Sequence, residues 1–264
     1  MNAYTEFSKI YDELMEDVPY DDWFEFVKKT LYDAGINGGI LCELGSGTGN
    51  FTMKFAEVGF DMIGIDNSIE MLNVALGKKN SHVAKLNNPF DKVSDILYLN
   101  QDMREFELYG TVAAIVSVFD SINYVLTDED IIQTFSLVNN YLDPAGLFIF
   151  DFNTVYKYKN VVSDSTIAES GEDASFIWSN CFDEESNINE YEMTFFVPVE
   201  IEGEENLYRR FDEYHYQRGY TLDEIKTFLK EAGLIFVDAF DAEGFTPVKE
   251  TSERIFVIAK ESGK

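Results

Sequence analysis

The sequence is poor in cationic residues, with 20 Lys and Arg against 49 Asp and Glu and a formal net charge of −29. Segment 164–206 alone holds thirteen acidic residues and no Lys or Arg. A surface of this sign repels a phosphate backbone, so nucleic acid is an unfavourable partner unless a basic groove is assembled locally. An acidic excess also keeps a protein soluble, so by itself it says little about the substrate.

Long apolar runs are also missing, since no stretch approaches the roughly 20 apolar residues that a membrane helix needs. Residues 1–18 are acidic and amphipathic, whereas a signal peptide has a basic region followed by an apolar core. We therefore expect a cytoplasmic protein with no signal peptide and no membrane partner.

Cysteine and histidine are scarce. The two cysteines, Cys42 and Cys181, lie far apart, and the two histidines, His82 and His215, are not spaced like a pair of metal ligands. A structural disulfide and a zinc site are both disfavoured by these numbers. We expect no metal cofactor.

Strand-like and helix-like patterns alternate through the first part of the chain. Residues 4–33 are expected to be helical with a break at Pro19, and segment 77–94 is expected to be an irregular link. Apolar runs predict strands, and helical spacing or capping residues predict helices: strands at 38–45, 60–66, 95–102, 111–120 and 147–153, helices at 48–58, 68–76 and 127–142. This alternation is typical of an α/β fold, a parallel sheet covered by helices on both faces.

The pattern changes after about residue 160. Alternating apolar and polar residues with acidic gaps predict antiparallel strands at 175–183, 188–201 and 206–220. A helix at 221–234 and strands at 235–241 and 253–260 return to the first pattern. We predict a core of residues 1–163 and 221–264, with cap helices in 4–33. An antiparallel sheet at 164–220 is inserted into it as a substrate lid or an oligomer interface.

A glycine-rich turn follows the first predicted strand, in residues 40–50, ILCELGSGTGN. Gly45, Gly47 and Gly49 would let backbone N–H groups approach a ligand closely. A dinucleotide-binding turn has the spacing G-x-G-x-x-G, which needs a third glycine where this chain has Asn50. An NAD-dependent oxidoreductase is therefore the less favoured reading.

The turn and the acid before it, Glu43, resemble the first signature of class I S-adenosylmethionine (SAM)-dependent methyltransferases. The resemblance continues in GIDNSIEML (64–72), NQDMREF (100–106) and FDSINYV (119–125). The terminal segments are similar to a bacterial subgroup of small-molecule or uncharacterised methyltransferases related to amino-sugar N-methyltransferases. The resemblance implies a Rossmann-like, seven-stranded, mostly parallel sheet plus the inserted antiparallel sheet. It also implies SAM as cofactor and S-adenosylhomocysteine as its product.

The expected cofactor site combines the glycines with acids at the ends of neighbouring strands. Asp66 lies about 20 residues beyond the first glycine, the spacing of an acid that accepts from ribose hydroxyls. Asp102 could accept from the adenine amino group, and Glu43 is either a ligand or a buried acceptor that orders the loop. With the residues that the resemblance adds, the expected set is Tyr4, Glu43, Gly45, Gly47, Gly49, Asp66, Asn67, Asp102 and Met103.

The segment after the fourth strand faces the methyl group in this fold. Its polar side chains suit a polar small molecule, and methyl transfer depends largely on holding the nucleophile and the methyl carbon in line. His215 is the candidate base, on a strand face shared with Phe211, Glu213 and Gln217. The expected catalytic residues are His215, Tyr11 and Asp120, and the expected substrate residues are Ser121, Asn123, Tyr124 and Arg218.

These observations predict methyl transfer from SAM to nitrogen or oxygen of a small polar metabolite, with an amine slightly favoured. The alternatives are an RNA or protein methyltransferase with the same core, and a SAM-binding regulator without turnover. We expect a monomer or a homodimer.

Overall fold

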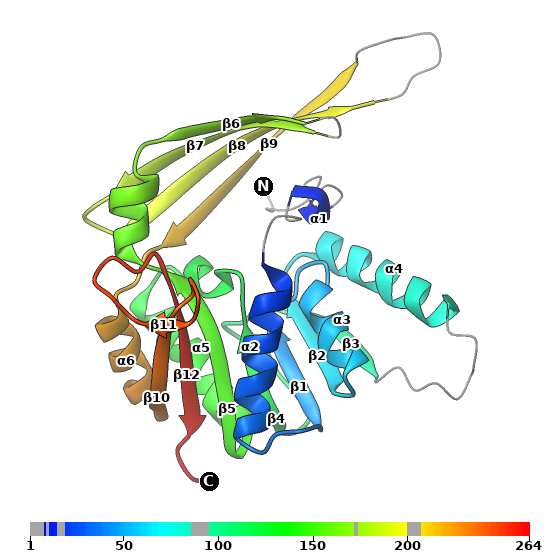
Figure 1. The fold of residues 1–264 in the computed structure, drawn as a ribbon, viewed down its shortest axis with the longest axis vertical. Helices are drawn as coiled ribbons and strands as arrows, with labels where there is room; N and C mark the ends of the chain where they lie inside the picture. Colours follow the sequence, from blue (N-terminus) through cyan, green and yellow to red (C-terminus); the bar gives the residue numbers. More distant parts are fainter. Residues whose placement is uncertain (1–7, 9–10, 15–18, 86–94, 172–173, 200–206) are drawn as a thin grey trace.

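A computed structural model describes residues 8, 11–14, 19–85, 95–171, 174–199 and 207–264. Its centre is an eight-stranded sheet in the order β11-β10-β12-β5-β4-β1-β2-β3 (Figure 1). The strands are β1 (Ile40–Leu44), β2 (Asp61–Asp66), β3 (Ile96–Asn100), β4 (Val112–Ser117), β5 (Leu142–Asn153), β10 (Leu234–Asp241), β11 (Thr246–Pro247) and β12 (Arg254–Glu261). Neighbours from β5 to β3 pair in parallel, whereas β12 is antiparallel to both β5 and β10. Apart from the two-residue β11, this is the predicted seven-stranded, mostly parallel sheet.

Helices cover both faces of this sheet (Figure 1). They are α2 (Tyr20–Asp33), α3 (Asn50–Glu57), α4 (Ile69–Lys85), α5 (Asp128–Tyr141) and α6 (Leu222–Glu231), together with the single-turn α1 (Tyr11–Leu14). One buried cluster joins α2 and α3 to the sheet, and another joins α5 and α6 to its opposite face. Burial of apolar surface on both faces explains the nearly continuous apolar strands that marked the fold in the sequence.

A second sheet of four antiparallel strands interrupts the core between β5 and α6. Its strands are β6 (Thr166–Ser170), β7 (Ser175–Asp183), β8 (Ile188–Pro198) and β9 (Tyr208–Arg218), and it arches over the end of the core where α1 lies (Figure 1). The six-residue π-helix η3 (Lys157–Val162) precedes it. One buried cluster contains Tyr11 of α1, Met71 of α4 and Phe195 of β8, so this sheet packs against the core through α1.

Helix ends follow their capping residues. The Thr221 side chain accepts from the Glu224 N–H while Glu224 bonds back to Thr221, which completes a capping box at the start of α6. At α5 the Thr127 side chain accepts from the Asp130 N–H, as the sequence predicts. Gly233, with φ 79°, ends the turn after α6.

Two sequence-based predictions of secondary structure differ from the structure. Residues 77–85, expected within an irregular link, extend α4, where the Lys79 side chain donates to the Ile96 carbonyl of β3 at 2.6 Å. Residues 86–94 lie outside the described residues. Strand β6 had no alternating apolar pattern to mark it, since all five of its residues are exposed.

Candidate functional site

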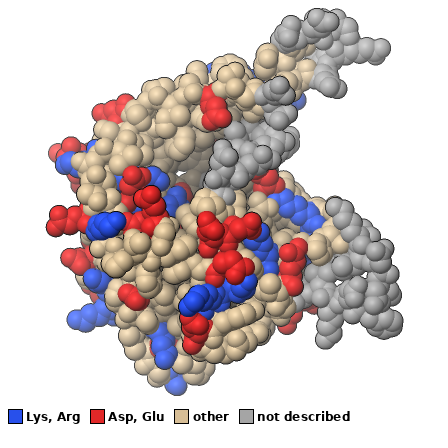
Figure 2. All heavy atoms as spheres, in the orientation of Figure 1, with Lys and Arg blue, Asp and Glu red and all other residues tan. Residues whose placement is uncertain are grey.

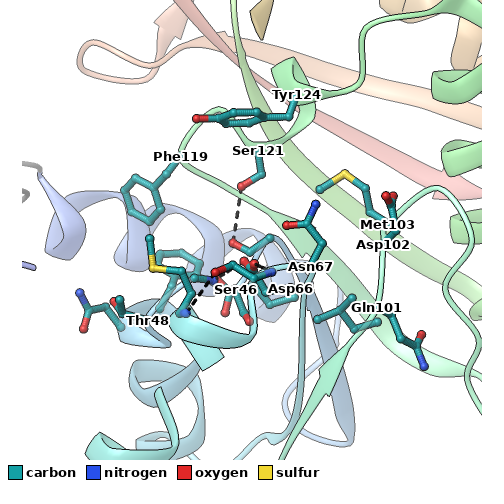
Figure 3. A pocket seen from close by; sticks show the side chains of 18 of the residues that line it. Ser46, Thr48, Asp66, Asn67, Gln101, Asp102, Met103, Phe119, Ser121 and Tyr124 are labelled. Atoms are coloured by element: carbon teal, nitrogen blue, oxygen red, sulfur yellow. Dashed lines mark hydrogen bonds between the residues drawn. The ribbon is translucent and has the colours of Figure 1, made fainter. Parts of the chain in front are cut away.

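A cavity of about 310 Å³ opens at the carboxyl ends of β1 and β2. Figure 3 shows Phe119, Ser121 and Tyr124 on one side of it, with Asp66 and Asn67 opposite. The expected site residues that line it are Tyr11, Glu43, Gly45, Gly47, Asp66, Asn67, Asp102, Met103, Ser121 and Tyr124. The structure therefore brings together residues from five separate stretches of the chain. Tyr4 lies outside the described residues.

The glycine loop turns tightly against β2. The N–H groups of Gly45 and Ser46 both donate to the Ile65 carbonyl, at 2.8 and 2.9 Å. Gly45 has φ 72°, and a Cβ there would lie 2.6 Å from the Ser121 Cβ, so a side chain is excluded. Gly47 has φ 53°, but a Cβ there would meet nothing within 4 Å. The backbone at Gly47 thus faces open space in the cavity, whereas Gly45 allows close packing of the protein itself.

Asp66 holds this loop from the end of β2. One carboxylate oxygen accepts from the Gly47 N–H and the other from the Ser68 N–H, both at 2.8 Å. Burial raises the pKa of Asp66, and these two backbone hydrogen bonds oppose that rise. A carboxylate has about four lone-pair sites, so both oxygens keep capacity to accept from hydroxyls of a ligand.

Glu43 is buried beneath the loop, in β1. Burial raises the pKa of Glu43 to about 8, the charge of Asp66 adds to the rise, and hydrogen bonds with Thr52 oppose it. The Thr52 hydroxyl donates to Glu43 and ties β1 to α3. Glu43 therefore lines the cavity and also orders the loop, and at neutral pH its proton is retained in most molecules.

The acid after β3, Asp102, is paired with a neighbouring arginine. The Arg104 guanidinium reaches the two Asp102 oxygens at 2.9 and 2.6 Å, and the Arg104 N–H donates to one of them at 2.9 Å. Hydrogen bonds from Arg104 lower the pKa of Asp102. Asp102 is therefore a carboxylate at this end of the cavity, beside Met103.

Helix α1 is fastened to the loop by Asp12. The Thr48 hydroxyl donates to the Asp12 carboxylate at 2.6 Å, Asn50 donates to the same oxygen at 3.0 Å, and Lys78 of α4 pairs with the other oxygen. This contact places Tyr11 against the cavity, where burial raises the pKa of its phenol. The tyrosine is consequently a neutral hydroxyl group at the cavity wall.

The turn after β4 has an unusual backbone. Phe119 and Asp120 are consecutive non-glycine residues in the left-handed region, with φ 61° and 54°. Each such residue costs about 1–3 kcal/mol and persists only where its surroundings hold it. The Phe119 ring stacks on Trp23 at 4.8 Å between centroids, which fixes it from the α2 side. The turn presents Phe119, Ser121 and Tyr124 to the cavity.

Asp120, a predicted catalytic residue, is not among the residues that line the cavity. Arg254 of β12 donates to one Asp120 oxygen at 2.6 Å, and Gln217 of β9 donates to the other at 2.6 Å. Arg254 also donates to the buried Asp151 at 2.7 Å. These contacts favour a positioning role for Asp120 over proton transfer.

His215 lies behind the cavity on the inner face of β9, as the strand alternation predicts. Its Nδ1 is 3.2 Å from the Tyr124 hydroxyl, which itself lines the cavity. Burial lowers the pKa of His215 to about 4, although the charge of Asp120 acts in the opposite direction. His215 is therefore neutral at physiological pH and can accept a hydrogen bond from Tyr124 in the appropriate tautomer, but it is a weak base.

The other two predicted substrate residues are engaged elsewhere. The Asn123 amide donates to the carbonyls of Asn153 and Arg218, at 2.9 and 2.7 Å, and its oxygen accepts from the Asn153 N–H at 2.8 Å. The Arg218 guanidinium bonds Asp128 at 2.6 Å and the Leu126 carbonyl at 3.3 Å. Neither residue lines the cavity, and both join the second sheet to the core. Their predicted contact with substrate stays a prediction.

Sequence reasoning missed several residues of the site. Tyr20 and Phe119 line the cavity, and Asp12, Gln217 and Arg254 hold its walls. Tyr20 follows Pro19 at a predicted helix start, a signal that could have placed it near the cap. The others meet partners between 36 and 134 positions away along the chain, so no local pattern identifies them.

The cavity fits the groups of SAM. Open space at Gly47 admits an amino acid tail against bare backbone, and the carboxylates at the ends of β2 and β3 suit hydroxyl and amino donors. Acidic and phenolic oxygens around the cavity also suit a sulfonium cation. Among the described residues, no group of three or more His, Cys, Asp or Glu has an arrangement that could hold a metal ion. No described helix is both long and apolar enough to cross a membrane.

Comparisons with known proteins agree with this geometry. Residues 41–146 match a family described as a methyltransferase domain. The chain is 36% identical to "Putative methyltransferase YqeM" of Bacillus subtilis (strain 168), over 98% of this chain and 97% of the relative. A solved SAM-dependent methyltransferase from Clostridium acetobutylicum ATCC 824 superposes with a TM-score of 0.85 and 28% identity, covering 99% of this chain and 100% of the other.

A further solved structure shares the fold. It is the SAM-bound amino pentose methyltransferase CalS10 from Micromonospora echinaspora, with a TM-score of 0.70, 16% identity and 99% coverage of both chains. Taken with the site, these likenesses define the class: the chain belongs to the class I SAM-dependent methyltransferases.

Proposed function

We propose that this enzyme methylates the nitrogen of a small polar amine in the cytoplasm. When bound, SAM supplies an electrophilic methyl group on a sulfonium cation. Gly47 and Asp66 would hold its amino acid and ribose parts, and Asp102 with Met103 its adenine. Phe119, Ser121 and Tyr124 face the remaining part of the cavity, where an acceptor would enter.

The low basicity of His215 carries the preference for nitrogen over oxygen. A hydroxyl acceptor must lose its proton as it attacks, so it needs a competent base nearby. His215 has a pKa of about 4, does not line the cavity itself, and contacts the Tyr124 hydroxyl, which does. An amine that binds in its neutral form attacks with its own lone pair and loses its proton afterwards. The site therefore suits an amine better than an alcohol.

The charges around the cavity support the same choice. Its lining residues include the carboxylates Asp66 and Asp102 and the protonated acid Glu43, whereas the cation among them, Arg104, is paired with Asp102. An anionic acceptor would meet no compensating charge from these residues, while the ammonium product of amine methylation is compatible with them. The shared fold of an amino pentose methyltransferase agrees with this class of acceptor.

Tyr11, Tyr20 and Tyr124 would position the acceptor. Burial raises the pKa of Tyr11, and it raises that of Tyr20 to about 12, so both act as neutral hydroxyls that accept or donate hydrogen bonds. His215 would orient Tyr124 through the contact between its Nδ1 and the phenol oxygen. These residues hold the nitrogen in line with the methyl carbon, which is the main requirement of the reaction.

The second sheet, within residues 164–220, would act as a lid over the acceptor side. It packs on α1 and α4 through the cluster of Tyr11, Met71 and Phe195. Its inner face carries His215 and Gln217 toward the turn after β4. A lid of this kind limits the acceptor to a small molecule, which disfavours RNA and folded protein. Acidic and basic side chains are interspersed over the core in Figure 2.

Labelled SAM tests the proposal. The enzyme is incubated with a metabolite extract separated into cationic, neutral and anionic fractions, with Asp66→Ala as the matched inactive control. We expect the label to enter a methylamine in the cationic fraction, at a rate that rises with pH toward the pKa of the amine. Label in a methyl ether, in RNA or in protein would overturn the preference for a small amine.

A further inference from the structure

The turn after β4 is held from two sides by residues outside the cavity. Arg254 bridges Asp120 and Asp151, and the Asp120 N–H also donates to Asp151 at 3.1 Å. The Arg254 guanidinium lies over the Trp23 ring, 5.0 Å from its centroid, and Trp23 stacks on Phe119. One guanidinium therefore braces both left-handed residues of the turn.

The second sheet is attached to the same carboxylate. Gln217 donates to Asp120, and the Gln217 side-chain oxygen accepts from the Tyr158 hydroxyl at 2.7 Å. Tyr158 in turn accepts from the Asn153 amide at 3.0 Å. Asp120 thus connects the core strand β12, the turn and strand β9 in one hydrogen-bond network, in which Asp151, Gln217 and Tyr158 are buried and Asp120 and Arg254 half-buried.

We propose that Arg254 and Gln217 are positioning residues for methyl transfer. Through Asp120 they hold the turn and β9 in the single arrangement that places Ser121 and Tyr124 against the cavity. Ser121 lies close to Gly45, so the wall that the turn forms begins at the edge of the cofactor loop. This role concerns the geometry of the site and does not depend on which acceptor is methylated.

The geometry predicts a selective defect. Asp66 is held by the Gly47 N–H and Asp102 by Arg104, so these residues would bind their parts of the nucleotide as before. Only the wall formed by Phe119, Ser121 and Tyr124 would shift. A misplacement of about 1 Å in an active site costs up to about 100-fold in rate, and a ligand group that contacts this wall should lose part of the same interaction.

Two ligands distinguish these parts of the cavity. S-adenosylhomocysteine lacks the methyl group, whereas sinefungin carries an amine in place of the methyl group, on a carbon that replaces the sulfur. Calorimetry on Gln217→Leu and Arg254→Lys should show S-adenosylhomocysteine affinity within about twofold of the unaltered protein and sinefungin affinity about tenfold weaker. Thr194→Val is the matched control, since it removes a hydrogen bond to Asp212 elsewhere in the second sheet, at 2.7 Å. It should change neither affinity.

Fluorescence gives an independent measure. The chain has two tryptophans, and Trp178→Phe leaves Trp23, stacked on Phe119, as the reporter of the turn. In that background Gln217→Leu should shift the emission and Thr194→Val should not. Equal losses for both ligands, no loss for either, or no difference between Gln217→Leu and Thr194→Val would each overturn the proposal. Gln217→Leu removes no charge, so this variant by itself tests the proposal if the Arg254→Lys protein does not fold.

Discussion

Replacing Gly47 with Ala should reduce ligand affinity much more than it reduces the stability of the fold. Gly47 has φ 53°, and a Cβ there would meet nothing within 4 Å, so the added methyl group projects into the cavity without a clash in the protein. The left-handed backbone costs Ala about 1 kcal/mol relative to Gly. For a chain of this length that corresponds to a loss of about 2–4 °C in Tm.

Ligand binding should suffer much more than stability. A methyl group at the place where an amino acid tail lies against the backbone forces the tail away from it. We expect S-adenosylhomocysteine to bind about 10–100-fold more weakly, equivalent to about 1.4–2.8 kcal/mol. Titration calorimetry gives the affinity, and a thermal melt of the same sample gives the stability.

Gly35 offers the matched control. It has φ 82° and, like Gly47, a Cβ there would meet nothing within 4 Å, but it follows the end of α2 and does not line the cavity. Gly35→Ala should lose a similar amount of stability and keep full affinity. If the Gly47→Ala protein binds S-adenosylhomocysteine within twofold of Gly35→Ala, the tail does not lie on this loop and the assignment of the cavity is refuted.

Three further predictions concern single carboxyl and imidazole groups. Asp66→Ala should weaken S-adenosylhomocysteine binding by about 100-fold or more, because it removes both the ribose acceptor and the bond to the Gly47 N–H, each worth about 1.5–3 kcal/mol; calorimetry with unchanged affinity would contradict this. In the folded protein Glu43 keeps its proton to about pH 8, whereas in the unfolded chain it releases the proton near pH 4.5. The free energy of unfolding should therefore fall by roughly 1–3 kcal/mol between pH 5 and pH 8. Urea titrations at several pH values should show this fall, and the Glu43→Gln protein should lack it. His215 has the opposite effect on the pH dependence of stability. Below pH 6.5 the unfolded chain binds a proton at this residue, whereas the folded protein binds it only near pH 4, so the free energy of unfolding decreases as the pH falls through this range. An NMR titration of the His82→Gln protein, in which His215 is the remaining histidine, should give a pKa below 5; a value near 6.5 would show that the ring is solvated.

The sequence predicted structure best where the local backbone or ligand requires one particular residue type. The glycines at 45, 47 and 49 and the acids at the strand ends have fixed spacing, so the turn and the edge of the sheet could be predicted together. The central strands β1, β4, β5 and β12 were predicted because burial on both faces makes them largely apolar. Strand β6 was missed because its residues are exposed and carry no such pattern.

The residues that hold the walls of the cavity could not be predicted from local sequence patterns. Arg254 meets Asp120 over 134 positions and Gln217 meets it over 97, so their roles depend on how the finished fold brings distant segments together. Asp120 was expected to take part in catalysis, and Asn123 and Arg218 to contact the substrate, because they are polar and lie near the right strand ends. The structure uses their polar atoms to join β9 to the turn.

The second sheet leaves and rejoins the core at almost the same point. Thr154 and Tyr220 form an isolated β-bridge, and the Val155 N–H donates to the Tyr220 carbonyl at 3.2 Å. We therefore expect the strands of the nucleotide-binding half to keep their register when this segment is lengthened, shortened or exchanged, provided that the contact of Gln217 with Asp120 is rebuilt. A short turn joining Thr154 to Tyr220 would give a minimal protein, and grafting a different sheet at the same junction gives a direct route to new acceptors.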